Sequence, residues 1–145
     1  LKLKRVGEVV LIPVASPRYL KGKDKIKSPT DLTGHSCLSI NVQGIPERWT
    51  LKSAKGTVHV PIKSKIASNQ MTSLMRMALA DGGIAFLPSY LCTQHIDDGE
   101  LVRILPEWAG HGLPTSIVTP LAPSSSARLK LTVDHLHLAL SAALK

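Results

Sequence analysis

Hydrophobic residues form short runs along the chain, separated by segments with a helical or a turn pattern. Residues 9–15 are almost entirely apolar, which predicts a strand buried on both faces, with Pro13 placed where no ladder N–H is needed. Residues 49–52 and 57–62 alternate apolar with polar positions around Gly56, which predicts a hairpin with one wet face. Further strands are predicted over residues 37–42, 84–87, 101–105 and 116–119.

Helical patterns lie between these runs. Apolar residues from Met71 to Leu79 recur at helical spacing, with Ser68 or Asn69 as the expected N-cap and Gly82 as the first residue beyond the helix. Shorter helices are predicted from Pro29 to Gly34 and from Pro88 to about His95, and a long one covers the C-terminal 20 or so residues. Strands that alternate with helices predict an α/β fold with a mainly parallel sheet.

The last helix has an unusually wide apolar face. One stripe is formed by Leu129, Val133, Leu136, Leu140 and Leu144, and a second stripe beside it by Leu131, Leu138 and Ala142. A helix that packs on a single sheet buries a face of only about 100°. We therefore expect a further segment or a second chain to cover part of this helix.

Composition narrows the class of protein. The 145 residues fit one domain, and 43% hydrophobic residues with two cysteines exclude a disordered chain and a disulfide-stapled secreted domain. No signal-peptide pattern and no membrane-length apolar run is present, so we expect a cytoplasmic protein without membrane contact. The chain begins at Leu1 rather than Met, which suggests a piece of a longer protein.

The formal charge of +8 is concentrated near the beginning of the chain. Residues 1–30 carry eight Lys or Arg against two acidic residues, whereas residues 66–145 carry slightly more acidic than basic residues. Such a basic region can bind nucleic acid, but only five aromatic residues are available to stack on bases. We therefore expect no direct contact of this chain with DNA and interpret the alternating lysines at 21–27 as a solvated loop.

Motifs of catalysis are absent from the sequence. It contains no nucleophile elbow, Walker A pattern, dinucleotide fingerprint or zincin motif, so we expect neither catalytic residues nor a cofactor. A zinc site could be drawn from His35, Cys37, Cys92 and His95, but the spacing is unlike that of known zinc motifs. We expect both cysteines to be buried core residues and no metal to be bound.

One segment has the character of a binding site. Ser68, Asn69 and Gln70 give the central helix a polar start, where free backbone N–H groups can receive an anion. Plain capping of the helix explains the same residues equally well. From spacing alone the two interpretations remain open.

Several phrases, taken in order, resemble one family. They are Val14 to Leu20, Ser28 to Leu32, Gly34 to Leu38, Trp49, Ala67 to Asn69, Ala78 to Pro88 and Gly99 to Pro106. Together they resemble the effector-binding domain of LysR-type transcriptional regulators, over nearly the whole chain. Each motif is weak by itself, and the specificity lies in their order and spacing.

The resemblance implies a fold like that of type 2 periplasmic binding proteins, with two α/β subdomains joined by crossing strands and an effector in the cleft between them. It assigns residues 1–16 to a crossing strand and part of the first subdomain, and residues 17–111 to the second subdomain. Residues 112–145 become the return strand and C-terminal helix of the first subdomain. The rest of the first subdomain and the winged helix-turn-helix are missing from this chain.

The resemblance also assigns site residues. It places the effector against two segments, which are Asn41, Val42 and Gln43 on one side and Ser68, Asn69, Gln70, Met71 and Thr72 on the other. It makes Ser16, Pro17 and Pro120 hinge residues. No acidic residue lies in the two effector segments, which favours a neutral or anionic effector. The residues that the family places there vary widely, so the identity of the effector does not carry over.

The resemblance implies partners and a mechanism. An effector would change the angle between the subdomains, and contacts in a homodimer or homotetramer would pass this change to DNA-binding domains outside this chain. A periplasmic solute-binding protein is the alternative from another class, and the zinc protein named above is a third. The residues that precede Leu1 in the parent protein would discriminate the first two.

Overall fold

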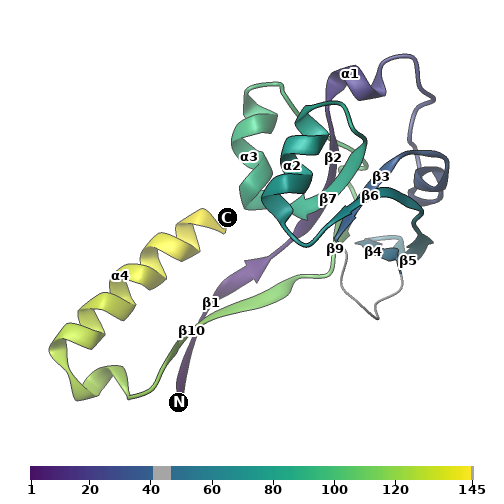
Figure 1. The fold of residues 1–145 in the computed structure, drawn as a ribbon. Coiled ribbons are helices and arrows are strands. Elements are labelled where there is room, and N and C mark those ends of the chain that lie inside the picture. Colours follow the sequence, from purple (N-terminus) through teal and green to yellow (C-terminus); the bar gives the residue numbers. More distant parts are fainter. Residues whose placement is uncertain (41–46, 145) are drawn as a thin grey trace. The chain divides into compact units, whose positions relative to one another are not determined.

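The computed structural model describes residues 1–40 and 47–144. By their contacts they form two compact units, which we describe separately (Figure 1). The larger unit comprises Val10–His111 and the smaller unit comprises Leu1–Val9 with Gly112–Lys145. The predicted division at 1–16, 17–111 and 112–145 refers to subdomains of a longer domain and stays a prediction.

The larger unit is built on a mixed five-stranded sheet in the order β6-β3-β7-β2-β8. Its strands are β2 (Leu11–Ala15), β3 (Cys37–Ile40), β6 (Ser64–Ser68), β7 (Ile84–Pro88) and β8 (Val102–Arg103). Strand β3 runs parallel to β6 and β7, whereas β2 runs antiparallel to β7 and β8. The carboxyl ends of β3, β6 and β7 therefore lie at the same edge of the sheet, which we call the carboxyl edge.

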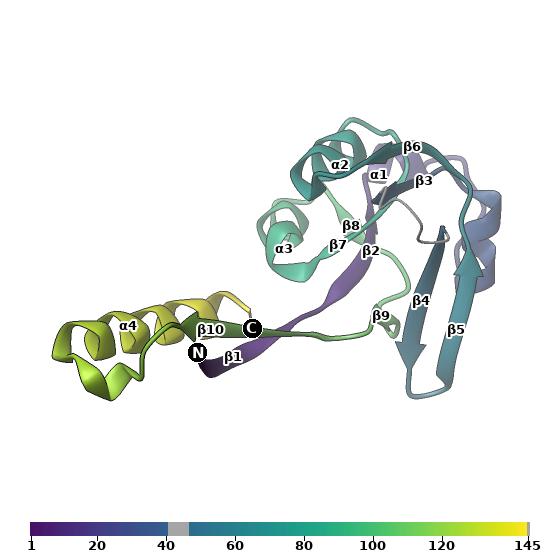
Figure 2. The same cartoon turned by 60° about the horizontal axis from the view of Figure 1, so that its bottom comes forward.

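Helices cover one face of this sheet. Helices α2 (Met71–Leu79) and α3 (Ser89–Asp97) pack on it, as Figures 1 and 2 show. The buried core between them contains Ile12, Val14, Leu38, Leu74, Ala78, Ala85, Leu87, Cys92 and Leu101. The periodicity of Met71 to Leu79 correctly predicted α2, because Leu74 and Ala78 point one turn apart into this core.

A second core fills the other face. It lies under the hairpin of β4 (Arg48–Ser53) and β5 (Gly56–Pro61), which β9 (Ala109–Gly110) extends to a three-stranded sheet. The short helices α1 (Pro17–Leu20) and η1 (Pro29–Gly34, a 3-10 helix) contribute Tyr19 and Leu32 to this core. Neighbouring residues of one strand thus enter different cores, as Val14 and Ala15 do. This double burial explains the unbroken apolar runs and confirms that interpretation for residues 11–15.

The ends of α2 differ from the prediction. Gln70, not Ser68 or Asn69, is the N-cap, and its side chain makes no capping hydrogen bond. At the other end Asp81, not Gly82, takes the left-handed position, with φ of 65°. The N–H of Asp81 donates to the Ala78 carbonyl, and that of Gly82 donates to the Met77 carbonyl. This is the hydrogen-bond pattern of a Schellman motif, with aspartate in the place that glycine usually occupies.

Three strands were not predicted as such and one is shorter than expected. The strands β1 (Lys2–Val9), β6 and β9 have no clear apolar pattern, and the run over residues 101–105 yields only the two residues of β8. In β6 and β1 most side chains are exposed or half-buried. An edge strand of this kind is held by its backbone ladder, so its side chains need not alternate.

The smaller unit pairs the two ends of the chain. Strand β1 runs antiparallel to β10 (Leu113–Thr119), with Lys2 opposite Thr119 and Val9 opposite Leu113. The short 3-10 helix η2 (Pro123–Ser125) leads into helix α4 (Ala127–Ala143), which buries Val133. The Lys4 ammonium lies 2.8 Å from the Asp134 carboxylate, and its hydrogen bond lowers the pKa of that carboxyl. Contacts of this kind hold α4 against the two-stranded sheet of β1 and β10.

The exposure of α4 fits the wide apolar face seen in the sequence. Leu131 and Leu138 are 72% and 71% exposed, and Leu136 and Leu140 are also on the surface. Exposed side chains of this size on one helix are typical of an interaction surface. That a further segment or chain covers them stays a prediction.

Candidate functional site

The carboxyl edge of the larger unit carries the predicted effector segment that the structure describes. Ser68 ends β6, Asn69 and Gln70 form the connection, and Met71 and Thr72 are the first residues of α2. Asn69, Gln70 and Thr72 are exposed, whereas Ser68 and Met71 are half-buried. The chain therefore presents two amide side chains and a helix start at the position where open α/β sheets bind ligands.

Local hydrogen bonds shape this connection. The backbone N–H of Gln70 donates to Ser68 Oγ over 3.1 Å, and Ser73 Oγ donates to Gln70 Oε1 over 3.4 Å. Since the Gln70 side chain makes no capping hydrogen bond, the first N–H groups of the helix can receive an acceptor from outside. A carboxylate or another oxygen-rich group is the natural acceptor at such a helix start.

The second predicted segment starts at the same edge. Ile40, the last residue of β3, pairs with Ser68 in the parallel ladder. The chain thus leaves β3 next to the start of α2. Asn41, Val42 and Gln43 themselves lie outside the described residues, so their assignment as effector contacts stays a prediction.

Sequence reasoning missed a buried hydroxyl near this edge. Ser39 is 4% exposed, and its Oγ has no hydrogen-bond partner among the described residues. It shares one face of the sheet with Cys37, whereas Leu38 and its neighbours in the ladder belong to the other. A lone serine within an apolar run was the only signal in the sequence. Buried polar groups usually have a partner, so this hydroxyl is a candidate for a water or a ligand atom.

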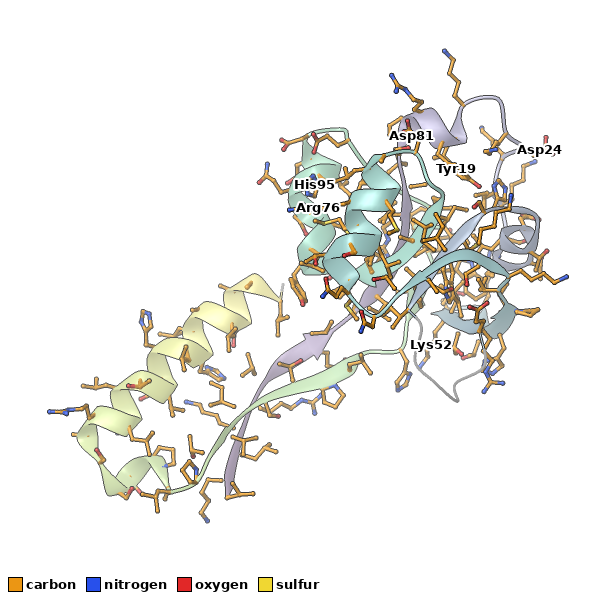
Figure 3. All side chains as sticks on the ribbon, viewed as in Figure 1. Tyr19, Asp24, Lys52, Arg76, Asp81 and His95 are labelled. Carbon is orange, nitrogen blue, oxygen red and sulfur yellow. The ribbon has the colours of Figure 1, made fainter. Side chains whose placement is uncertain are left out.

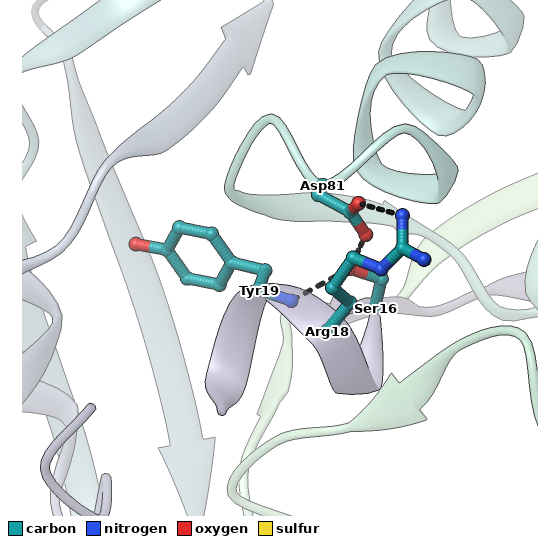
Figure 4. A network of polar contacts seen from close by, with 4 residues as sticks. All are labelled: Ser16, Arg18, Tyr19 and Asp81. Atoms are coloured by element: carbon teal, nitrogen blue, oxygen red, sulfur yellow. Dashed lines mark hydrogen bonds and ion pairs between the residues drawn. The ribbon is translucent and has the colours of Figure 1, made fainter. Parts of the chain in front are cut away.

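The predicted hinge residues Ser16 and Pro17 lie inside the larger unit, at the start of α1. Ser16 Oγ accepts from the Tyr19 N–H over 3.1 Å and donates to Asp81 Oδ1 over 2.7 Å, as Figure 4 shows. Arg18 adds a longer contact of 3.5 Å to the same carboxylate. Pro120 follows β10 in the smaller unit. The hinge role of these residues stays a prediction.

We expect Ser16→Ala to lower the free energy of unfolding by about 1–2 kcal/mol, because it removes a cap and a partner of a half-buried carboxylate. Urea denaturation measures the change. A double-mutant cycle with Asp81→Ala separates the two contributions, and we expect a coupling energy of at least about 0.5 kcal/mol. Strict additivity of the two substitutions would contradict the described network.

The cysteines and histidines of the possible zinc set do not form a site. Cys37 and Cys92 are buried, as predicted, but they belong to the cores on opposite faces of the sheet. Burial raises the pKa of the Cys37 thiol to about 12 and that of Cys92 to about 11, which keeps both sulfurs protonated. His35 contacts Tyr19 and His95 contacts Glu100. Within residues 1–40 and 47–144, no three His, Cys, Asp or Glu side chains gather as metal ligands.

A mixed α/β sheet with a polar helix start at its carboxyl edge is an arrangement in which proteins bind small molecules. Residues 1–141 match the profile of the LysR substrate binding domain. The chain therefore belongs to this family. The solved regulatory domains that it resembles have the periplasmic-binding-protein type 2-like fold, and the chain shares it.

Its relatives are transcriptional regulators. The chain is 32% identical over 117 residues to an uncharacterized HTH-type transcriptional regulator of Haemophilus influenzae, covering 81% of this chain and 41% of the relative. It is 32% identical over 119 residues to the HTH-type transcriptional regulator PtxR of Pseudomonas aeruginosa, covering 79% of this chain and 36% of the relative. The chain thus spans less than half the length of these relatives.

Solved structures agree with this assignment. The regulatory domain of AphB from Vibrio vulnificus is 26% identical, with a TM-score of 0.80 over 95% of this chain and 68% of that domain. The regulatory domain of CrgA from Neisseria meningitidis shares the fold, with 24% identity and a TM-score of 0.80 over 96% of this chain and 69% of that domain. In the described residues, no helix combines the length and apolar character that crossing a membrane requires.

Proposed function

We propose that this chain is the effector-sensing part of a LysR-type transcriptional regulator and that it is not an enzyme. The effector is a small neutral or anionic molecule bound at the carboxyl edge, against Ser68 to Thr72 and Asn41 to Gln43. The observation that carries the proposal is the uncapped, exposed start of α2 at that edge, in a chain of this family. That the effector lies in a cleft between two subdomains stays a prediction.

The chemistry of the segment supports this choice of effector. The amides of Asn69 and Gln70 can donate and accept, and the first N–H groups of α2 can only donate. The two segments contain no acidic side chain that would attract a cation. An effector with a carboxylate would therefore gain charge-assisted hydrogen bonds here.

In the whole protein, we propose that effector binding changes how a DNA-binding domain outside this chain contacts DNA. This chain itself does not hold DNA. We also propose that the whole protein assembles as a homodimer or homotetramer. It acts in the cytoplasm, where a transcriptional regulator can reach its operator. The solved full-length AphB of Vibrio cholerae, a member of the same family, shares the fold of this chain at a TM-score of 0.83.

A thermal-shift screen of the full-length protein tests the proposal. The panel consists of small carboxylates, amino acids and aromatic acids. We expect at least one compound to raise the melting temperature with saturation, because a ligand that binds only the folded state stabilises it by mass action. Asn69→Ala and Gln70→Ala should each weaken that binding about five-fold or more, the cost of one hydrogen bond.

Gln94→Ala is the matched control. It removes an exposed amide of α3 that is hydrogen-bonded to Asp98, within the same unit but outside the carboxyl edge. The control should bind the compound as the wild type does. If the compound shifts the wild type, Asn69→Ala and Gln70→Ala equally, the assignment of these residues is wrong.

A further inference from the structure

The larger unit holds a polar pocket of about 630 Å³, in addition to the proposed effector segments at the carboxyl edge. Its walls come from three segments, which are the loop after α1, η1 with the residues that follow it, and the start of β6. Figure 3 labels Tyr19, at its floor, and Asp24, on the loop. A volume of this size is within the range of ligand pockets, about 300–1,000 Å³.

The pocket lies at the end of the sheet opposite the carboxyl edge. Ser36 immediately precedes β3, and Lys65 is the second residue of β6, which runs parallel to β3. The carboxyl edge begins four residues after Ser36, at Ile40, and three residues after Lys65, at Ser68. The pocket is therefore separate from the proposed effector segments.

Three lysines give the pocket its charge. Lys23 and Lys25 come from the loop, and Lys65 comes from β6. None of the three forms an ion pair with another residue that the structure describes. An excess of cations around one concavity raises the local concentration of anions.

Two acidic residues, Asp24 and Asp31, line the same pocket. The Asp31 carboxylate accepts from the backbone N–H groups of Lys27 and Ser28, each over 2.9 Å, and these bonds lower the pKa of Asp31. Its lone pairs thus serve to cap η1. With Asp24, the lining holds two carboxylates against three lysines, a formal excess of one positive charge.

The floor of the pocket is neutral and ordered. Tyr19 is 9% exposed, and its hydroxyl accepts from the Ser36 N–H over 2.9 Å. Burial raises the pKa of the Tyr19 phenol, so the ring remains uncharged. The Lys23 ammonium lies 4.8 Å from the centre of this ring, a cation–π contact that holds it over the floor.

We propose that this pocket is a second ligand site, which binds a small oxyanion with two or more negative charges. Two lysines from the loop and a third from β6 line the same pocket, so a multivalent anion can engage lysines of both segments. A phosphate ester and a di- or tricarboxylate share this chemistry. A concavity lined by three segments favours such a molecule over the backbone of DNA, which would need a continuous strip of cations.

Isothermal titration of the full-length protein with inorganic pyrophosphate, citrate and acetate tests this proposal. We expect saturable binding of pyrophosphate, citrate or both, with acetate at least about ten-fold weaker, and affinity that falls as salt screens the charges. Binding of pyrophosphate alone would identify the phosphate class, and binding of citrate alone the carboxylate class. The absence of saturable binding of both multivalent anions at millimolar concentration would overturn the proposal.

Substitutions locate the binding. Lys65→Gln and Lys23→Gln should each weaken it about three- to five-fold, whereas Lys65→Arg should retain it. Lys52→Gln is the matched control, since it removes an exposed lysine of β4 that does not line the pocket. Equal weakening by Lys52→Gln and Lys65→Gln would show non-specific attraction and overturn the site. So would a lysine-dependent affinity for duplex DNA without any for the small anions. Circular dichroism verifies that each variant is folded.

Discussion

Replacing Leu74 by alanine should lower the free energy of unfolding of the larger unit by about 2–5 kcal/mol, the range measured for buried leucines in other proteins. Leu74 is completely buried, and it lies on the inner face of α2 against the sheet. Truncation leaves a cavity at this contact and also removes apolar area from the core. Urea denaturation, followed by the fluorescence of Trp49 and Trp108, measures the change in the unit that contains both.

A substitution by alanine at an exposed position of the same helix is the control for Leu74→Ala. Arg76 is exposed and forms no ion pair within the described part of the chain. Arg76→Ala should change the unfolding free energy by no more than about 0.5 kcal/mol. A loss below about 1 kcal/mol for Leu74→Ala would mean that α2 is not packed as described. The proposed effector segment would then lose its support, since it begins this helix.

Gly83→Ala is the second substitution with a large expected effect, more than about 2 kcal/mol of destabilisation. Gly83 has φ of +149°, which L side chains rarely adopt, and an added Cβ would lie 2.3 Å from the Ser36 carbonyl oxygen. That oxygen also accepts the Ile84 N–H over 2.9 Å, where β7 begins beside β3. The methyl group therefore adds strain and displaces a hydrogen bond that aligns two central strands.

Gly34→Ala provides the comparison. An added Cβ at Gly34 would have no other atom within 4 Å, and its φ lies outside the region of strain. We expect this variant to unfold at the same urea concentration as the wild type, within experimental error. Similar destabilisation by both substitutions would contradict the close approach described at Gly83.

In the larger unit, the strands and the helix that the hydrophobic pattern predicted best are those whose side chains enter a core. Residues 11–15 and 84–88 are buried on both faces of the sheet, and the apolar positions of α2 face the helix-side core. The pattern of hydrophobic residues in a sequence reflects which side chains are buried, so it predicted these elements. The hairpin of β4 and β5 was found for the same reason, because Trp49 and Leu51 alternate with exposed residues.

The elements and caps that the sequence did not predict have a different physical origin. Strands β1 and β6 are mostly exposed, and their backbones are held by distant partners that no local pattern can indicate. The predicted caps of α2 were wrong because several polar or small residues stand side by side at each end of this helix. Tertiary contacts then decide between them, as at Asp81, whose side chain is held by Ser16 in a conformation that glycine adopts more easily.

The two candidate sites also differ in how far the sequence could predict them. The segment from Ser68 to Thr72 is continuous, so its polar character at a helix start was visible in the sequence. The lysine pocket joins Lys23 and Lys25 to Lys65, which lies forty residues later. In the sequence Lys23 and Lys25 were interpreted as part of a solvated loop, and Lys65 was not assigned a role. Only the folded chain brings the three lysines to one pocket.

The pairing of Lys2 with Thr119 has a consequence for the order of folding. Strand β1 leaves the ribosome before the larger unit, but its partner β10 follows only after the entire larger unit has been synthesised. Contacts so far apart in sequence are slow to form, because the intervening chain must be closed into a loop. The larger unit can complete its two cores in the meantime and bring Val10 and His111 into position as it does so. Damage to that unit, as in Gly83→Ala, should therefore also delay the pairing of β1 with β10.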